Sequence, residues 1–189
     1  MKPQTTTTPH VIIMVGIPGA GKSTFAEHFA TTFQAPIINH SLIRDIVEHD
    51  DARAQQLAGL MLDELLKTHR TLIYEGPTQT KGSRVELTRK ITDAGYKPLL
   101  VWVQTESVEA QRRATKKQKS HSAMTAEEFE TAIKRFSPPH VNEKAIVISG
   151  KHTYATQLKI ILKHLAGQQQ AEQIVVPPRV RSARNIILR

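Results

Sequence analysis

The sequence contains no cysteine and no long apolar run, and each absence excludes a class of protein. Without cysteine there is no disulfide framework, no thiolate zinc site and no cysteine nucleophile. This is compatible with the reducing cytoplasm, where we expect the protein to be located. The longest apolar stretches, such as 11–15, are far below the roughly 20 residues that span a bilayer, and residues 1–10 hold no apolar segment of signal-peptide length. We expect neither a membrane-embedded nor a secreted protein.

Acidic residues are also comparatively few, with 17 Asp and Glu against 26 Lys and Arg and a formal net charge of +9. The sequence pI is about 9.9. A positive field of this kind attracts polyanions and raises the rate at which they are encountered. It favours a nucleic acid or a phosphate-rich substrate, although excess Lys and Arg also serve simply to keep a small protein in solution. Charge alone does not separate these alternatives.

The length of 189 residues suits one α/β domain with tails and is short for two domains. Short β-branched runs alternate with segments whose apolar residues recur every three or four positions, which predicts a parallel sheet flanked by helices. Strands are expected at 11–15, 36–39, 71–75, 98–103 and 145–149. Helices are expected at 22–33, 41–49, 52–70, 81–94, 107–119, 125–136 and 153–166, with Gly95 and Gly167 as stop signals.

These elements define the predicted domain organisation. Residues 10–166 form the domain and residues 1–9 a flexible N-terminus. Residues 167–189, which contain a glutamine run, two adjacent prolines and four arginines, are expected to form a basic C-terminal tail.

The segment GIPGAGKST, Gly16–Thr24, fits the pattern G-x-x-x-x-G-K-[S/T] between a predicted strand and a predicted helix. Glycines let backbone N–H groups turn inward around phosphate oxygens, and the following helix directs its positive dipole end at the same anion. Lys22 is expected to reach the β- and γ-phosphates, and the Ser23 hydroxyl to coordinate Mg²⁺. The predicted nucleotide-binding residues are Gly16, Pro18, Gly19, Ala20, Gly21, Lys22, Ser23 and Thr24. We expect ATP with Mg²⁺, and GTP stays open.

With this loop as its most specific motif, the chain resembles the small P-loop kinases, which include polynucleotide 5′-kinases and zeta-toxin-like kinases, over about residues 11–165. The resemblance implies an AAA-type, ATP-binding, single-domain phosphotransferase. Its fold would be the P-loop NTPase three-layer sandwich, an α/β fold with a five-stranded parallel sheet, helices on both faces and an arginine-bearing helical lid. The lid corresponds to about residues 107–140. Such kinases usually transfer the γ-phosphoryl group of ATP to a hydroxyl.

In these kinases an acidic residue follows the second strand, with an arginine three positions later, and both help to bind and activate the acceptor hydroxyl. Arg44 matches the arginine, but Ser41 stands where the aspartate is expected and cannot take a proton as a carboxylate does. His40 and Asp45 are alternative bases. The simpler interpretation of Ser41 is a cap for a helix that begins at Leu42.

Glu75 resembles the acidic residue with which the third strand of these kinases ends, usually an aspartate. The resemblance implies that it holds Mg²⁺ or orients the acceptor, and the alternative is an ordinary exposed glutamate. Thr78 and Arg84 are further candidates for acceptor contacts. Arg84 is equally well interpreted as a solvated helix residue.

Arg112 and Arg113 match the arginines that the lid helix of these kinases carries, so one of them is expected to neutralise charge on the transferring group. The lysines at 116, 117 and 119 make this segment strongly basic, although most of them suit a solvated helix face. Trp102, in an apolar strand, is expected in the core rather than as a platform for base stacking.

The sequence and its resemblance together predict an ATP-dependent kinase. The predicted catalytic residues are Lys22, Arg44, Glu75, Arg112 and Arg113, with Ser23 and Glu75 at the metal. A nucleic-acid 5′-hydroxyl is the first choice of acceptor, contacted through the basic lid and tail, and a nucleoside, sugar or nucleotide-sugar is nearly as well supported. The alternatives are a nucleotide-gated module that binds nucleic acid or protein, which Ser41 favours, and a plain ATPase. No feature predicts an oligomeric state.

Overall fold

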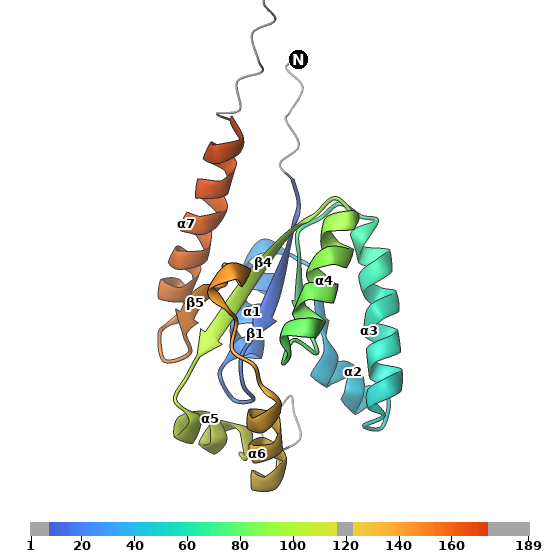
Figure 1. The fold of residues 1–189 in the computed structure, drawn as a ribbon, viewed down its shortest axis with the longest axis vertical. Coiled ribbons are helices and arrows are strands. Elements are labelled where there is room, and N and C mark those ends of the chain that lie inside the picture. Colours follow the sequence, from blue (N-terminus) through green and yellow to red (C-terminus); the bar gives the residue numbers. More distant parts are fainter. Residues whose placement is uncertain (1–7, 117–122, 174–189) are drawn as a thin grey trace, which may run out of the picture.

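The computed structural model describes residues 8–116 and 123–173. Its strands form one all-parallel sheet in the order β2-β3-β1-β4-β5. They are β1 (His10–Val15), β2 (Ile37–Asn39), β3 (Leu72–Glu75), β4 (Lys97–Gln104) and β5 (Ile146–Ser149). Because the strands are parallel, their carboxyl ends lie at one edge of the sheet, at the lower end of the view in Figure 1. The predicted five strands and their parallel arrangement are confirmed.

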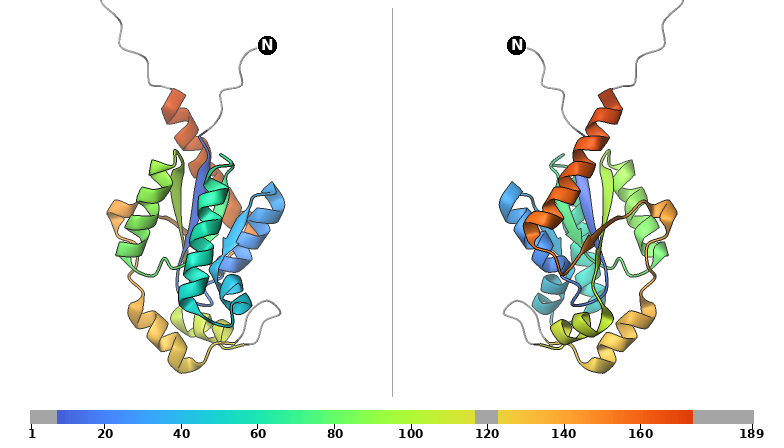
Figure 2. Two further views of the ribbon diagram at one scale, coloured as in Figure 1. Left: turned by 90° about the vertical axis from the view of Figure 1, so that its right-hand side faces the viewer. Right: turned by 90° about the vertical axis from the view of Figure 1, so that its left-hand side faces the viewer.

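Helices cover both faces of the sheet, as Figure 2 shows. They are α1 (Lys22–Phe33), α2 (His40–Ile46), α3 (Asp51–Leu66), α4 (Lys81–Asp93), α5 (Ser107–Ala114), α6 (Ala126–Arg135) and α7 (Tyr154–Gln173), with a short 3₁₀ turn, η1, at Val141–Glu143. Side chains alternate along a strand, so neighbouring residues of β1 belong to different cores. Ile13 packs with Leu62 of α3 and Ile91 of α4, whereas Ile12 packs with residues of α1 and α7. This three-layer arrangement is the predicted fold class.

Two predicted helix ends need correction. The stop at Gly167 is wrong, because α7 continues to Gln173; a glycine inside a helix costs only about 1 kcal/mol relative to alanine, which does not by itself end the helix. Residues 167–173 are therefore helical rather than part of a tail, and 174–189 lie outside the described residues. Gly95, by contrast, follows α4 with a φ of 81° and a hydrogen bond to Thr92, as a stop signal requires.

Other boundaries shift by smaller amounts. The helix predicted at 52–70 ends at Leu66, and His69 adopts a positive φ of 51° shortly after it. The helix predicted at 107–119 ends at Ala114, and its last predicted residues fall in 117–122, outside the described part of the chain. The predicted flexible N-terminus likewise falls mostly in the undescribed residues 1–7. Among the described helices, none is both long and apolar enough to cross a lipid bilayer.

Candidate functional site

The glycine-rich segment Gly16–Thr24, here called the phosphate loop, connects β1 to α1 where the carboxyl ends of the strands lie. Gly16, Gly19 and Gly21 have φ values of 148°, 73° and 104°. Residues other than glycine rarely adopt φ values in this region. A Cβ at Gly19 would collide with the carbonyl oxygen of Ala110 in α5, and one at Gly16 would lie 2.7 Å from the carbonyl oxygen of Val103. The loop thus depends on glycine both for its backbone angles and for its close packing against neighbouring segments.

Lys22 folds back over this loop. Its Nζ atom donates a hydrogen bond to the carbonyl oxygen of Ile17 at 3.0 Å. Burial lowers the pKa of Lys22, and the nearby charge of Glu75 partly opposes this effect. An anion placed in the loop would favour the charged form of the amine, so the lysine is placed to respond to a phosphate group.

Ser23 and Glu75, the two predicted metal residues, lie in contact. The Ser23 Oγ atom donates a hydrogen bond to Glu75 Oε1 at 2.7 Å. Glu75 is only 5% exposed, so the alternative of an exposed strand-end glutamate is wrong. Its second oxygen, Oε2, is buried and has no hydrogen-bond partner among the described residues. A buried carboxylate oxygen without a partner is costly, and a hydroxyl beside a carboxylate is a donor set that suits Mg²⁺, so these residues fit that ion.

The two arginines of α5 have different surroundings. Both donate to the Glu109 carboxylate, and these hydrogen bonds lower the pKa of Glu109 to about 2. Arg113 also donates to the carbonyl oxygen of Gly150 at 3.0 Å, and Gly150 packs against the backbone of Ala20 in the phosphate loop. The Arg112 side chain is 55% exposed, whereas that of Arg113 is 29% exposed. The structure thus places Arg113, rather than Arg112, beside the loop.

A cavity of about 150 Å³ lies next to Arg113, between the start of α1 and the loop that follows β5. Thr24 and His28 of α1 and Tyr154 of α7 contribute to its lining. The rings of His28 and Tyr154 are stacked, with their centroids 5.1 Å apart. The cavity therefore combines flat rings with an arginine, directly beside the phosphate loop.

The residues predicted on the acceptor side come from β2 and α2. Asn39 is the register partner of Glu75, so α2 begins close to the metal residues. Asn39, not Ser41, caps this helix by accepting a hydrogen bond from the Leu42 N–H at 3.1 Å, and α2 begins at His40. The predicted cap at Ser41 is therefore wrong, because the helix starts two residues earlier than expected.

Arg44 is half-exposed and forms an ion pair of 3.7 Å with Asp51. No described hydrogen bond or ion pair joins it to Lys22, Ser23 or Glu75. On α6, hydrogen bonds with Thr125 lower the pKa of Glu128, and the charges of Arg44 and His49 add a smaller effect. Burial lowers the pKa of His40, against the charge of Asp51. Asp45 is the other alternative base, and its Oδ1 atom lies 3.5 Å from His49 Nδ1.

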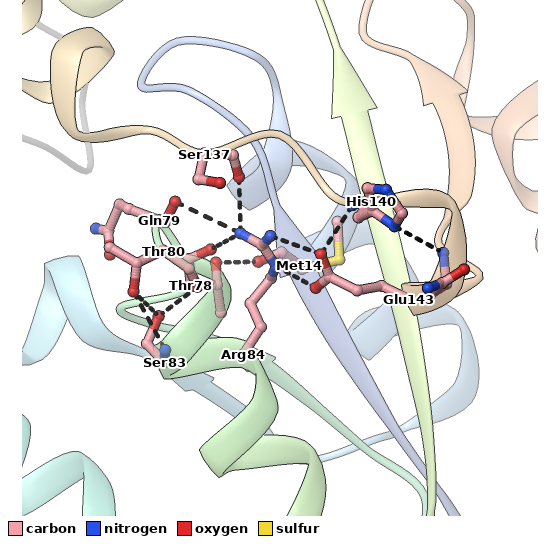
Figure 3. Close-up of polar contacts among 10 residues, drawn as sticks. Met14, Thr78, Gln79, Thr80, Ser83, Arg84, Ser137, His140 and Glu143 are labelled. Carbon is pink, nitrogen blue, oxygen red and sulfur yellow. Dashed lines mark hydrogen bonds and ion pairs between the residues drawn. The ribbon is translucent and has the colours of Figure 1, made fainter.

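Arg84 matches neither sequence interpretation, because it is fully buried and forms an internal polar cluster (Figure 3). Its Nε and NH2 atoms donate to the Glu143 carboxylate at 2.6 and 2.9 Å, and NH1 donates to the carbonyl oxygens of Thr78 and Ser137 at 3.0 and 2.9 Å. Thr78, the other acceptor candidate, is buried and donates to the carbonyl oxygen of Met14 at 2.8 Å. The partners of Arg84 are up to 59 positions away, so no local pattern signals this role.

Trp102 packs against the core, as expected, but it is only partly buried. Its side chain also lines a cavity of about 460 Å³, together with Ile17 of the phosphate loop and Phe136 after α6. Lys151 and Glu106 line the same cavity and form an ion pair of 2.8 Å. Trp102 therefore lies between the core and a cavity that borders the phosphate loop.

The comparisons with known proteins agree with this geometry. A family model described as an AAA domain matches residues 11–139. No curated protein sequence matches the chain.

Several solved structures share the fold. A gluconokinase from Sinorhizobium meliloti 1021 aligns with a TM-score of 0.65 and 18% identity over 88% of this chain and 98% of its own. Kti12 from Chaetomium thermophilum, solved with ADP-AlF3, aligns with a TM-score of 0.64 and 13% identity over 82% and 97%. A chain in a structure of the Pnkp1/Rnl/Hen1 RNA repair complex aligns with a TM-score of 0.60 and 21% identity. The alignment covers 71% of this chain and 46% of that one. At these identities the likeness is one of fold.

Proposed function

The chain belongs to the AAA domain family, and on this basis we propose that it is a phosphotransferase that moves the γ-phosphoryl group of Mg-ATP to a hydroxyl acceptor. The observation that carries the proposal is the contact between Ser23 Oγ and Glu75 Oε1 at 2.7 Å, beside a partly buried lysine in a glycine-rich loop. A phosphate site and a site suited to Mg²⁺ thus adjoin, as phosphoryl transfer from a nucleotide requires.

The phosphate loop and Lys22 would bind the triphosphate. Backbone N–H groups of the loop and the start of α1 provide donors and a positive dipole end for phosphate oxygens. Lys22 would exchange its hydrogen bond with the Ile17 carbonyl for one with a phosphate oxygen. The exchange replaces a neutral acceptor with a charged one, which strengthens the hydrogen bond.

Ser23 and Glu75 would hold the metal through the hydroxyl oxygen and the carboxylate. The unpartnered Oε2 atom of Glu75 supplies an oxygen that is already free to take part. A metal ion held there would supply positive charge against the negative charge of the phosphates. By holding the ion, Glu75 and Ser23 would help to orient the phosphate chain.

Arg113 is the better of the two candidate lid arginines. It lies beside the phosphate loop through Gly150, and Glu109 orients its side chain at 2.7 Å. We propose that about residues 107–140, of which 117–122 lie outside the described part of the chain, form the lid, and that Arg113 stabilises charge on the transferring group. The cavity beside Arg113, with the stacked rings of His28 and Tyr154, would take the nucleotide base.

The acceptor would bind between α2 and α6, near Arg44 and His40. Burial lowers the pKa of His40, which favours the neutral imidazole, the form that can accept a proton. A nucleic-acid 5′-hydroxyl is our first choice of acceptor, since the net charge is +9 and one similar structure is an RNA repair complex. The basic C-terminal residues would then add phosphate contacts. A sugar is the second choice, favoured by the likeness to a gluconokinase.

One observation favours a different function. Ser41 is exposed on α2 and provides no carboxylate where the resemblance implies one, which suits a module that binds nucleotide without efficient transfer. Transfer to water, as in an ATPase, is the third candidate, because a phosphoryl group lacking a bound acceptor can pass to water.

A labelling experiment separates these functions. The protein is incubated with Mg²⁺ and γ-labelled ATP in the presence of 5′-hydroxyl DNA and RNA oligomers, nucleosides or sugars, with Lys22→Ala and Ser41→Asp alongside. Label on one acceptor that is lost in Lys22→Ala supports the kinase and names its substrate class. Release of free phosphate alone indicates an ATPase. Binding of ATP without any labelled product, until Ser41 becomes Asp, contradicts the kinase and supports the binding module.

A further inference from the structure

The Arg84 cluster joins the turn before α4 to residues 137–143, which follow more than 50 positions later in the sequence. Arg84 lies in the first turn of α4, on the chain that follows β3. Its guanidinium binds the turn at Thr78 and Gln79, the segment at Ser137, and Glu143 in η1. Figure 3 shows these partners arranged around the one side chain. A buried guanidinium with this many directed hydrogen bonds fixes the relative positions of the backbones that it binds.

The ion pair at the centre of the cluster is largely shielded from water. Arg84 has no exposed side-chain surface, and Glu143 keeps 10%. Hydrogen bonds from Arg84 lower the pKa of Glu143, against the effect of burial, so the pair stays ionised. A buried pair of this kind is a poor source of net stability compared with apolar side chains of similar size. The pair therefore matters more for the positions of the segments it joins than for net stability.

One arm of the cluster leads to Glu75. The turn that begins at Gly76 follows this residue directly, and a Cβ at Gly76 would lie 2.5 Å from the Tyr74 ring. Thr78, two residues further, donates to the Met14 carbonyl in β1 while its own carbonyl accepts from Arg84. Contacts on both sides of the turn thus hold the end of β3 against the strand that leads into the phosphate loop.

The other arm leads to the segment that returns from α6. The Ser137 N–H donates to the Gln79 carbonyl at 2.8 Å, and the Ser137 carbonyl accepts from Arg84 at 2.9 Å. Phe136, its neighbour, lines the cavity that Trp102 and Ile17 share. The return from α6 is thereby tied to the same turn that follows Glu75.

We propose that Arg84 is a positioning residue, which holds the Glu75 carboxylate on Ser23 and ties the segment returning from α6 to the same turn. The inference rests on the proposed function, because the Ser23–Glu75 pair is given its role there. Arg84 touches neither residue of that pair in any described contact, so it acts through the backbone of 76–80. Its removal is expected to loosen the metal site while the phosphate loop keeps its own contacts.

The test compares three variants with the natural protein. The double variant Arg84→Met, Glu143→Leu replaces the buried pair with apolar side chains and is therefore expected to fold. Arg84→Lys keeps the charge but loses the planar donor geometry. Lys90→Met is the matched control. Lys90 lies on the same helix as Arg84, and its substitution breaks an exposed ion pair of 2.7 Å with Asp63.

Two readouts are measured, one of which needs no nucleotide. Hydrogen exchange of the Ser137 amide and of 76–80 is expected to speed up in the double variant, while the amides of β1 keep their protection. In ATP titrations, the Mg²⁺ concentration for half-maximal effect is expected to rise by about tenfold, as is typical when a group supporting a metal ligand is lost. Affinity for ATP without Mg²⁺ should stay unchanged. Arg84→Lys should fall between the natural protein and the double variant in both readouts, and the control should match the natural protein.

Two results would overturn the proposal. One is faster exchange spread equally over β1 and the turn, which would mean general loss of stability. The other is an unchanged Mg²⁺ requirement in a double variant whose exchange has changed. If the natural protein itself shows no Mg²⁺-dependent ATP binding, the proposed function fails, and the exchange readout alone decides whether Arg84 holds the turn.

Discussion

Glu75 and Asn39 are register partners on neighbouring strands, yet the regions next to them differ. Glu75 adjoins the phosphate loop, here called the phosphate side, and Asn39 leads into α2, here called the acceptor side. On the phosphate side, Glu75 is 5% exposed and contacts Ser23 directly. On the proposed acceptor side, the Arg44 and Asp51 side chains are 40% and 77% exposed and their closest charged atoms are 3.7 Å apart. The phosphate side is thus arranged before any ligand binds, whereas the acceptor side has room to change. Mutations should therefore have larger and more predictable effects on the first side than on the second.

The largest effect is expected for Lys22→Ala on the phosphate side. The hydrogen bond with Ile17 holds this charged donor over the loop, and a hydrogen bond to a charged group contributes about 1.5–3 kcal/mol. We expect ATP to bind about 10- to 100-fold more weakly, measured by calorimetric titration. Lys163→Ala, an exposed lysine of α7, is the control. Unchanged ATP affinity in Lys22→Ala would contradict the claim that this loop binds the phosphates of ATP.

Two glycines, one in the phosphate loop and one in α3, test the difference in packing. Gly19→Ala would collide with Ala110 and adopt a φ of 73°, which costs about 1–2 kcal/mol for the backbone alone. Gly59→Ala lies in α3 with nothing within 4 Å of the new Cβ and should stabilise the helix by about 0.5–1 kcal/mol. Urea unfolding measures both. Equal effects of the two substitutions would show that the phosphate side is no more tightly built than α3.

A smaller effect is expected for substitutions in α2. Ser41→Asp places a carboxylate near the start of the helix, where it stabilises the helix by about 0.3–1 kcal/mol and supplies a base at the acceptor side. We expect faster transfer of label from ATP with little change in ATP affinity, and Ser41→Ala as control should leave both unchanged. A loss of ATP affinity in Ser41→Asp would mean that the two sides are coupled more closely than their contacts indicate.

The smallest effect concerns pH and His40. Burial lowers its pKa from the ordinary value of 6.5, so the folded state takes up a proton less readily than the unfolded state. This contribution leaves stability unchanged above pH 6.5 and reduces it as pH falls from 6.5 toward the lowered pKa. Urea unfolding at pH 7.5 and 5.5 should show a smaller decrease for His40→Gln than for the natural protein. An identical decrease in both proteins would place His40 in a solvent-like environment.

The same contrast explains how much of the fold could be predicted from the sequence. Short β-branched runs and three-to-four periodicity are local signals, so all five strands and the order of the helices were within reach. The ends that were missed depend on context. Gly167 has the composition of a stop signal, but α7 continues beyond it to Gln173. Asn39 replaces Ser41 as the cap because the chain leaves β2 directly into the helix.

For the candidate site, prediction followed the range of the interaction. Lys22 and Ser23 belong to one contiguous motif whose spacing carries its chemistry. Glu75 could be proposed from its place at a strand end, but its contact with Ser23 spans 52 positions and needed the sheet order. Arg84 could not be assigned at all, because Glu143 and Ser137 approach it only after the chain has returned from α6. Side chains fixed by a distant backbone leave no periodic signal.

The central claim, that Ser23 and Glu75 form a metal site beside a phosphate loop, is tested most directly by titrating ATP with and without Mg²⁺. The natural protein, Glu75→Gln and the control Glu86→Gln, a residue exposed on α4, are compared by calorimetry. We predict that Mg²⁺ tightens ATP binding in the natural protein and the control, and that Glu75→Gln loses only this Mg²⁺-dependent part. Equal Mg²⁺ dependence in all three proteins, or no ATP binding by the natural protein, would contradict the claim.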